Sequence, residues 1–148
     1  MESGFQWYSF GVKPPNQGHR EVEHTADLEL EVWGPDMAAL LEEAARGMYE
    51  LMAVEVSDES RRHHRLEIAA DDREQLMVSF LEDLLFLADT EDLGFDGFLL
   101  SVGDTELLAR LEGGFIIARR REIKAVTFHS LSIAGSGSGL RTNVVFDV

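Results

Sequence analysis

The chain has 148 residues and a mass of 16.6 kDa, a size typical of one domain with a single hydrophobic core. Its 28 acidic and 13 basic side chains give a net charge of −15 with histidine neutral, which argues against a small nucleic-acid-binding module that neutralises phosphates with Lys and Arg. Because cysteine is absent, disulfides, thiolate zinc sites and thiol catalysis are excluded, and a metal site must use oxygen or imidazole ligands.

The acidic side chains are concentrated in the middle of the chain. Residues 21–118 carry a net −19, whereas residues 1–20 carry +1 and residues 119–148 carry +3. Such a field attracts cations and basic proteins, although a solvated surface kept soluble by its charge has the same composition. The start of the chain has no basic region followed by an apolar run, and no stretch of about 18 apolar residues occurs. We therefore expect a cytoplasmic protein without membrane contact.

Residues 1–20 show no sustained periodicity and contain turn-forming residues, so we predict an N-terminal extension there and a domain over residues 21–148. From Glu21 to Trp33 apolar and acidic residues alternate. This period of two predicts one strand, or two strands joined by a kink, with Leu28, Leu30 and Val32 on the inner face.

Two helices follow in the pattern. Asp36 is the predicted N-cap of the first, over residues 37–52, and Glu42, Glu43 and Glu50 are expected off its apolar stripe. A short strand over residues 65–70 precedes the second helix, whose predicted capping box is Asp71 and Glu74. The second stripe consists of Met77, Phe80, Leu81, Leu84, Leu85 and Ala88, and the helix is expected to end near Thr90.

The remaining chain is predicted to form strands in pieces, at residues 98–102, 106–111, 115–118, 123–133 and 142–148. The run GSGSG at 135–139 lacks the following helix and the Lys of a phosphate-binding loop, so we interpret it as a hairpin connection. The predicted fold class is α+β: a single domain in which two amphipathic helices pack on mainly antiparallel β-strands.

Few residues form patterns that suggest chemistry. The basic run Arg61, Arg62, His63, His64 and Arg65 could contact an anion or RNA, but we interpret it first as a solvated patch in a polar linker, and likewise residues 119–121. His129 and Ser130 are adjacent and therefore on opposite strand faces, with no orienting carboxylate nearby, so no nucleophile with its base is recognisable. No catalytic residue is predicted.

Two carboxylates stand out as candidate metal ligands. Asp27 lies on the polar face of the first strand, three residues after His24, a spacing that places the two side chains on opposite faces of a regular strand. Asp147 lies in the apolar ending VVFDV, directly before the α-carboxylate of Val148. If the last strand pairs beside the first, these groups form an all-oxygen site suited to Ca²⁺ or Mg²⁺. Two solvated surface acids remain the alternative.

Several segments together resemble the archease family. They are HTADLELEVWG at 24–34, AARGMYELM at 44–52, SFLEDLLFLADTE at 79–91, EIKAVTFH at 122–129 and the terminal VVFDV. The resemblance implies an archease-like fold and a cytoplasmic accessory protein, not an enzyme, that supports the RtcB-type RNA ligase of tRNA splicing. Such a protein promotes guanylylation of the ligase and multiple turnover, while the ligase supplies the manganese and nucleotide chemistry.

The resemblance also implies site residues. The family's metal site, usually described with calcium, corresponds to Asp27, Asp147 and Val148 here, with Mg²⁺ or Mn²⁺ as alternatives to Ca²⁺. Lys124 matches the lysine of the family's KA(V/I)T(Y/F) motif, and its ammonium is a candidate for an activation or docking contact with the ligase. RNA is then the partner's substrate, and direct nucleic-acid binding is not expected.

Two departures from the family pattern bear on the contact with the ligase. Ala38 and Ala39 stand where many members have two acids, so that any role of those acids is lost or moved to Glu42 and Glu43. The loop before the KA motif is shortened to residues 118–122. Two other hypotheses stay open: a small divalent-metal-dependent hydrolase using the same carboxylates, and an acidic chaperone-like binding module.

Overall fold

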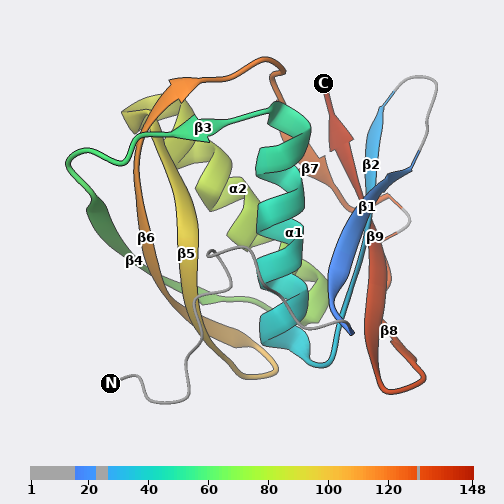
Figure 1. Cartoon of the computed structure of the whole chain (residues 1–148). Coiled ribbons are helices and arrows are strands. Elements are labelled where there is room, and N and C mark those ends of the chain that lie inside the picture. Colours follow the sequence, from blue (N-terminus) through green and yellow to red (C-terminus); the bar gives the residue numbers. More distant parts are fainter. Residues whose placement is uncertain (1–15, 23–26, 130) are drawn as a thin grey trace.

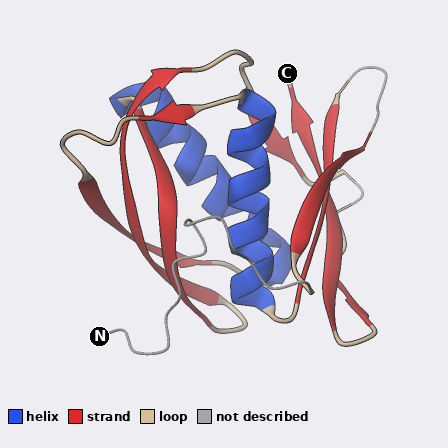
Figure 2. Cartoon of the chain, in the orientation of Figure 1, coloured by secondary structure: helices blue, strands red, loops and turns tan. Residues whose placement is uncertain are grey.

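The computed structural model describes residues 16–22, 27–129 and 131–148. Within them two helices lie between two antiparallel β-sheets, with a sheet on each side of the helix pair (Figures 1 and 2). In chain order the elements are β1 (Gly18–Val22), β2 (Leu28–Gly34), α1 (Met37–Met52), β3 (Glu55–Val56), β4 (Arg62–Ala69), α2 (Arg73–Glu91), β5 (Leu93–Val102), β6 (Glu106–Ala118), β7 (Ala125–Thr127), β8 (Ala134–Ser136) and β9 (Gly139–Asp147). The predicted α+β class with antiparallel strands is confirmed.

The first sheet has the order β1-β2-β9-β7, with β8 also paired to β9. The alternating segment therefore forms two strands that pair with each other, β1 with β2, and β1 extends across the boundary that we predicted between residues 20 and 21. On β2, Leu30 and Val32 are buried against the helices, as the alternation predicts. The C-terminal strand β9 lies inside the sheet because it pairs with β2 on one side and with β7 and β8 on the other.

The second sheet is built around β6, which pairs with β3, β4 and β5. Its inward residues Leu107, Ala109 and Leu111 are buried in the core. β6 is one continuous strand through Gly113 and Gly114, where two separate pieces were predicted, and β5 begins at Leu93, five residues earlier than predicted. The strand continues through the glycines because both pair with β5, and the approach is so close that a Cβ at Gly113 would fall 1.9 Å from the Gly94 carbonyl oxygen.

Both helices contact both sheets, and this explains their wide burial. On α2 the whole predicted stripe is buried, and so are Leu76, Val78 and Leu87, which lie off it. On α1 the prediction that Glu43 lies off the apolar stripe is wrong, because its side chain is fully buried. A helix between two sheets needs apolar residues around most of its circumference, so the single amphipathic stripe expected for each helix underestimates the buried surface.

The helix starts follow the capping rules. The Asp36 carboxylate accepts a hydrogen bond from the Ala39 N–H, as predicted. The second cap is one residue later than predicted, because Asp72 accepts from the Gln75 N–H while the Gln75 side chain accepts from the Asp71 N–H. Glu74 instead accepts from the Ile133 N–H, and so ties α2 to the segment before β8.

The predicted hairpin at GSGSG is confirmed, since β8 and β9 pair from Ser136 with Gly139 onward and Gly137 has a φ of +57°. Over residues 123–133, where one strand was predicted, β7 is the only regular element among the residues that the structure describes. The basic run at 61–65 lies largely in β4 and not in a linker. In the described part of the chain, neither helix is long and apolar enough to cross a membrane.

Candidate functional site at the end of the first sheet

The antiparallel register of β2 and β9 brings Asp27 and Asp147 to the same end of the sheet. The register ends with the pair Leu28 and Phe146; Asp27 directly precedes β2, and Asp147 is the last residue of β9. Asp27 is half-buried and Asp147 is exposed. The strand pairing on which the sequence argument depended is therefore present, with β2 as the partner of the last strand.

Lys124 lies on the other side of the C-terminal strand. β7 pairs with β9 through Ala125 and Asp147, and the Lys124 N–H donates a 2.8 Å hydrogen bond to the Asp147 carbonyl oxygen. Lys124 directly precedes β7 and Val148 directly follows β9, so both lie at this end of the sheet. Figure 1 shows the C-terminal end of β9 between β2 and β7. Residues from three distant parts of the chain thus meet at one end of the sheet because β9 is an interior strand.

Ion pairs and hydrogen bonds order the outer face of this sheet. Asn143 donates a 2.6 Å hydrogen bond to Glu29, and Glu31 is held by Arg20 at 2.5 Å and by Arg141. Burial alone would raise the pKa of the Glu31 carboxyl, but the hydrogen bonds and charges of the two arginines outweigh it and lower the pKa. These side-chain contacts join β2 to β1 on one side and to β9 on the other, and so stabilise the strand that follows Asp27.

The donor set at this end suits a hard cation. It consists of two aspartates and the main-chain oxygens of Val148, and oxygen ligands of this kind are preferred by Ca²⁺ and Mg²⁺. Within the described residues no three His, Asp or Glu side chains converge as a preformed metal cage. Two carboxylates and the main-chain oxygens provide fewer ligands than Ca²⁺ or Mg²⁺ takes, so a cation bound there would keep water molecules as its other ligands.

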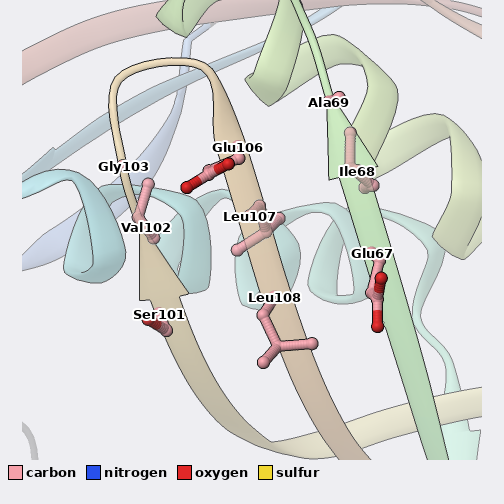
Figure 3. Close-up of a pocket in the computed structure, with 9 residues that line it drawn as sticks. All are labelled: Glu67, Ile68, Ala69, Ser101, Val102, Gly103, Glu106, Leu107 and Leu108. Carbon is pink, nitrogen blue, oxygen red and sulfur yellow. The ribbon is translucent and has the colours of Figure 1, made fainter.

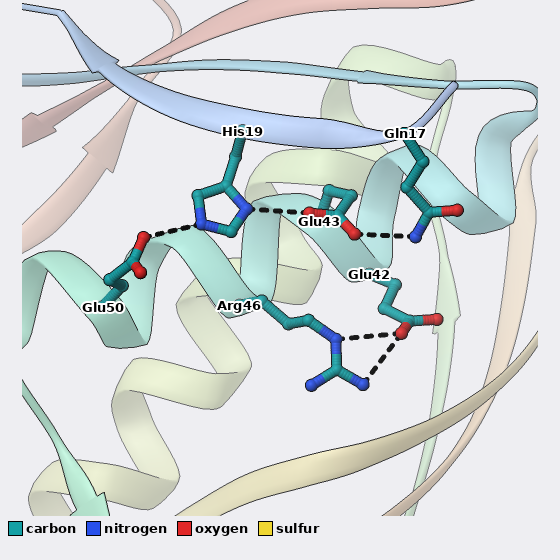
Figure 4. Close-up of polar contacts among 6 residues, drawn as sticks. All are labelled: Gln17, His19, Glu42, Glu43, Arg46 and Glu50. Carbon is teal, nitrogen blue, oxygen red and sulfur yellow. Dashed lines mark hydrogen bonds and ion pairs between the residues drawn. The ribbon is translucent and has the colours of Figure 1, made fainter. Parts of the chain in front are cut away.

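A second polar cluster lies between β1 and α1, and the sequence analysis missed it. The buried Glu43 carboxylate accepts hydrogen bonds from Gln17 Nε2 and His19, each at 2.7 Å (Figure 4). The other ring nitrogen of His19 lies 2.7 Å from Glu50. Glu43 is three residues after Leu40 and four before Gly47 on the buried face, so a charge within the apolar stripe was the available signal. Residues 17 and 19 therefore belong to the packed domain.

Glu42 and Glu43, the acids nearest to Ala38 and Ala39 on α1, both have partners within the protein. Glu42 forms an i,i+4 ion pair of 2.9 Å with Arg46, whose guanidinium lies over the Phe98 ring. Glu43 is committed to the contact with β1. Glu42 and Glu43, to which the role of the family's helix acids would have moved if it is not lost, are thus both engaged in contacts that stabilise α1.

A third feature is a hollow of about 710 Å³ at the β5–β6 hairpin (Figure 3). The residues that line it include Glu67, Glu106, Leu107 and Leu108. Asp27, Lys124 and Asp147 do not line it. His24 and Ser130 lie outside the described residues, and His129 is exposed. The residues that the sequence singled out for metal binding therefore converge at the end of the first sheet and not at this hollow.

Comparison with known proteins gives a consistent family match. Residues 19–148 match the model of the Archease protein family (MTH1598/TM1083). The chain is 30% identical to the protein archease of Methanothermobacter thermautotrophicus, over 89% of this chain and 99% of the relative. It is also 30% identical to the protein archease of Archaeoglobus fulgidus, over 88% of this chain and 98% of the relative.

Two solved structures resemble the chain over most of its length. The solution structure of protein 1598 from Methanobacterium thermoautotrophicum superposes with a TM-score of 0.69 at 30% identity, covering 88% of this chain and 99% of that one. The crystal structure of an archease, described as a possible chaperone, from Thermotoga maritima superposes with a TM-score of 0.66 at 25% identity, covering 87% and 96%. Sequence and fold comparisons thus point to one family.

Proposed function

Because this chain belongs to the archease family, we propose that it is a metal-binding accessory protein that activates an RtcB-type RNA ligase in tRNA splicing and RNA repair. In this proposal it promotes guanylylation of the ligase and thereby multiple turnover, and it acts in the cytoplasm without joining RNA itself. The observation that supports the proposal is that β9 pairs with both β2 and β7, so that Asp27, Lys124, Asp147 and Val148 lie at the same end of the sheet.

The proposed cation ligands are the carboxylates of Asp27 and Asp147 and the main-chain oxygens of Val148. Two aspartates side by side repel each other, and a cation between them removes this repulsion and supplies a positive charge at the surface. We propose Ca²⁺ as the ion, since a flexible, partly hydrated oxygen set suits it, with Mg²⁺ or Mn²⁺ as alternatives.

Lys124 supplies a second positive charge at this end of the sheet. It is exposed, and within the described residues its side chain has no hydrogen bond or ion pair. A free ammonium on a surface is available to an acidic group of a partner. We propose that Lys124 contacts the ligase or the anionic group being activated, and that the bound cation and the ammonium form one contact surface.

The test is the number of turnovers that an RtcB-type ligase completes on a broken RNA with and without this protein. We expect one turnover or few without it and many with it. Unchanged turnover in its presence would refute the activating role. The protein should also be incubated alone with phosphoester substrates, because hydrolysis would favour the metal-dependent hydrolase, and alone with an aggregating client protein, because protection without ligase activation would favour a chaperone-like module.

The metal role is tested with Asp27→Asn and Asp147→Asn, which keep the side-chain shape and remove one charged oxygen each. Asp104→Asn, in the turn between β5 and β6, is the matched control, since Asp104 is an exposed aspartate remote in the fold from this end of the first sheet. We expect both site variants to weaken Ca²⁺ binding and activation while the control has no effect. Full activation and unchanged Ca²⁺ affinity in both site variants would refute the metal role.

A further inference from the structure

The side chains of the basic run at residues 61–65 have different surroundings, because successive residues of β4 point to opposite faces of the sheet. Arg61 forms an ion pair with Asp96 and lies 3.5 Å from Glu112, and the Arg62 guanidinium lies 4.5 Å from the centre of the Phe115 ring. His64 faces inward, with its ring 5.9 Å from the ring of Phe95. His63 and Arg65 have the opposite parity and are exposed on the outer face of the second sheet.

The pairing of β4 with β6 sets Arg65 directly opposite Arg110. Both are exposed, and their strand neighbours Ile68, Ala109 and Leu111 are buried on the inner face, so the two guanidinium groups stand on the same outer face. Like charges directly opposite each other destabilise an antiparallel pair. An anion bound between the two arginines would offset this repulsion.

Few acidic side chains neutralise the positive charges of Arg65 and Arg110. Arg65 forms an ion pair of 3.0 Å with Glu67 on its own strand, but both side chains are more than half exposed, so the pair contributes little. Within the described residues Arg110 has no hydrogen bond or ion pair with an acid. Glu112, which stands opposite His63, is already shared with Arg61.

A shallow recess of about 260 Å³ lies at this position. Its lining consists of His63, His64, Arg65, Arg110 and Leu111, and thus contains two arginines and two histidines but no acidic side chain of the described chain. The protein has a net charge of −15, so a hollow lined by basic side chains differs in charge from most of its surface. It is also separate from the proposed metal site, which is on the other sheet.

We propose that this recess binds a phosphate group, as carried by a nucleotide or by the end of a nucleic acid. The planar guanidinium group binds two phosphate oxygens at once, and two such groups side by side can enclose one phosphate. His63, on the same outer face, supplies a further ring N–H donor. A single phosphate fits better than a long polyanion, because the acidic surface around the recess repels an extended strand.

The proposal is tested by titrating the ¹⁵N-labelled full chain with inorganic phosphate at constant ionic strength. We expect saturable shifts of the backbone amides of residues 63–65 and 110–111 and of the two arginine side-chain signals. Further titrations with GMP, and with a short oligoribonucleotide with and without a terminal phosphate, distinguish the two sources of the phosphate. Absence of saturable shifts for all of these ligands, or shifts spread evenly over the molecule, would overturn the proposal.

The matched variants are Arg110→Gln and Arg65→Gln, with Arg120→Gln as the control because Arg120 is an exposed arginine outside the recess. Each recess variant should lower phosphate affinity about tenfold and the control should leave it unchanged. Since Arg110→Gln also removes the like-charge contact, the ligand-free variant should melt no lower than the wild type, whereas phosphate should raise only the wild-type melting temperature. Equal phosphate affinity in all three variants would refute the assignment.

Discussion

The cluster of His19 and Glu43 makes a quantitative prediction about stability. The Glu43 side chain is 0% exposed and that of His19 is 10% exposed, so His19→Ala removes a hydrogen-bond donor from a buried carboxylate. Removing one partner of a buried ion pair typically costs about 3–5 kcal/mol. We expect His19→Ala to lower the free energy of unfolding by about 3 kcal/mol, and to lower the melting temperature of a chain of this size by roughly 6 °C or more.

The second carboxylate on the same ring is the matched control. Glu50 is also 2.7 Å from His19, but its side chain is 75% exposed, so Glu50→Gln should cost less than about 1 kcal/mol. The assay is urea unfolding followed by circular dichroism, with both variants measured beside the wild type. In a Glu43→Leu background His19→Ala should cost much less than alone, because no buried charge remains to be compensated.

Two results would refute this reasoning. Equal costs of His19→Ala and Glu50→Gln would mean that burial does not set the energy of the contact. Additivity of His19→Ala with Glu43→Leu would mean that the two side chains do not interact. The same reasoning predicts that a chain starting at residue 21 is strongly destabilised, since it lacks Gln17, His19 and more than half of β1.

Three further predictions concern the framework of the fold. Because folding lowers the pKa of Glu31, its ion pairs stabilise the protein above the unfolded pKa, and this stabilisation is lost as the pH falls through the folded pKa. Glu31→Gln should therefore cost about 1–2 kcal/mol at pH 7 and almost nothing in acid, measured by urea unfolding at both pH values. Asp72→Ala removes the acceptor for the Gln75 N–H and should lower stability by about 1 kcal/mol in the same assay. Gly113→Ala should prevent stable folding, seen as loss of the cooperative melting transition, because its Cβ would overlap the Gly94 carbonyl.

Local patterns in the sequence predicted much of the fold. The alternation in residues 28–32 and the acid at residue 36 are read from neighbours along the chain, and the structure confirms the inner face and the cap. Asp27 and Asp147 were chosen from strand face and position, and the pairing of β2 with β9 brings them to the same end of the sheet. Their role as metal ligands stays a prediction.

The features that the sequence did not predict depend on contacts between distant segments. Nothing local shows that α2 is covered by two sheets, so Leu76 and Leu87 appeared to lie off its buried stripe. The glycines at 113 and 114 are typical of a break, but here they pair with β5, and the close approach of that strand leaves no room for a Cβ at Gly113. The juxtaposition of Arg65 with Arg110 likewise follows from the β4–β6 register and not from either segment alone.

The two proposed sites lie on different sheets and share no residue, and this has a consequence for their coupling. A cation between Asp27 and Asp147 binds across the β2–β9 pair and stabilises it, whereas a phosphate between Arg65 and Arg110 stabilises the β4–β6 pair. Both helices contact both sheets, so each ligand stabilises the whole fold. Without a second conformation that both ligands favour, however, neither changes the other's affinity. Their effects on the free energy of unfolding should therefore add. The net charge of −15 agrees with a cation site but gives no indication of a local basic site.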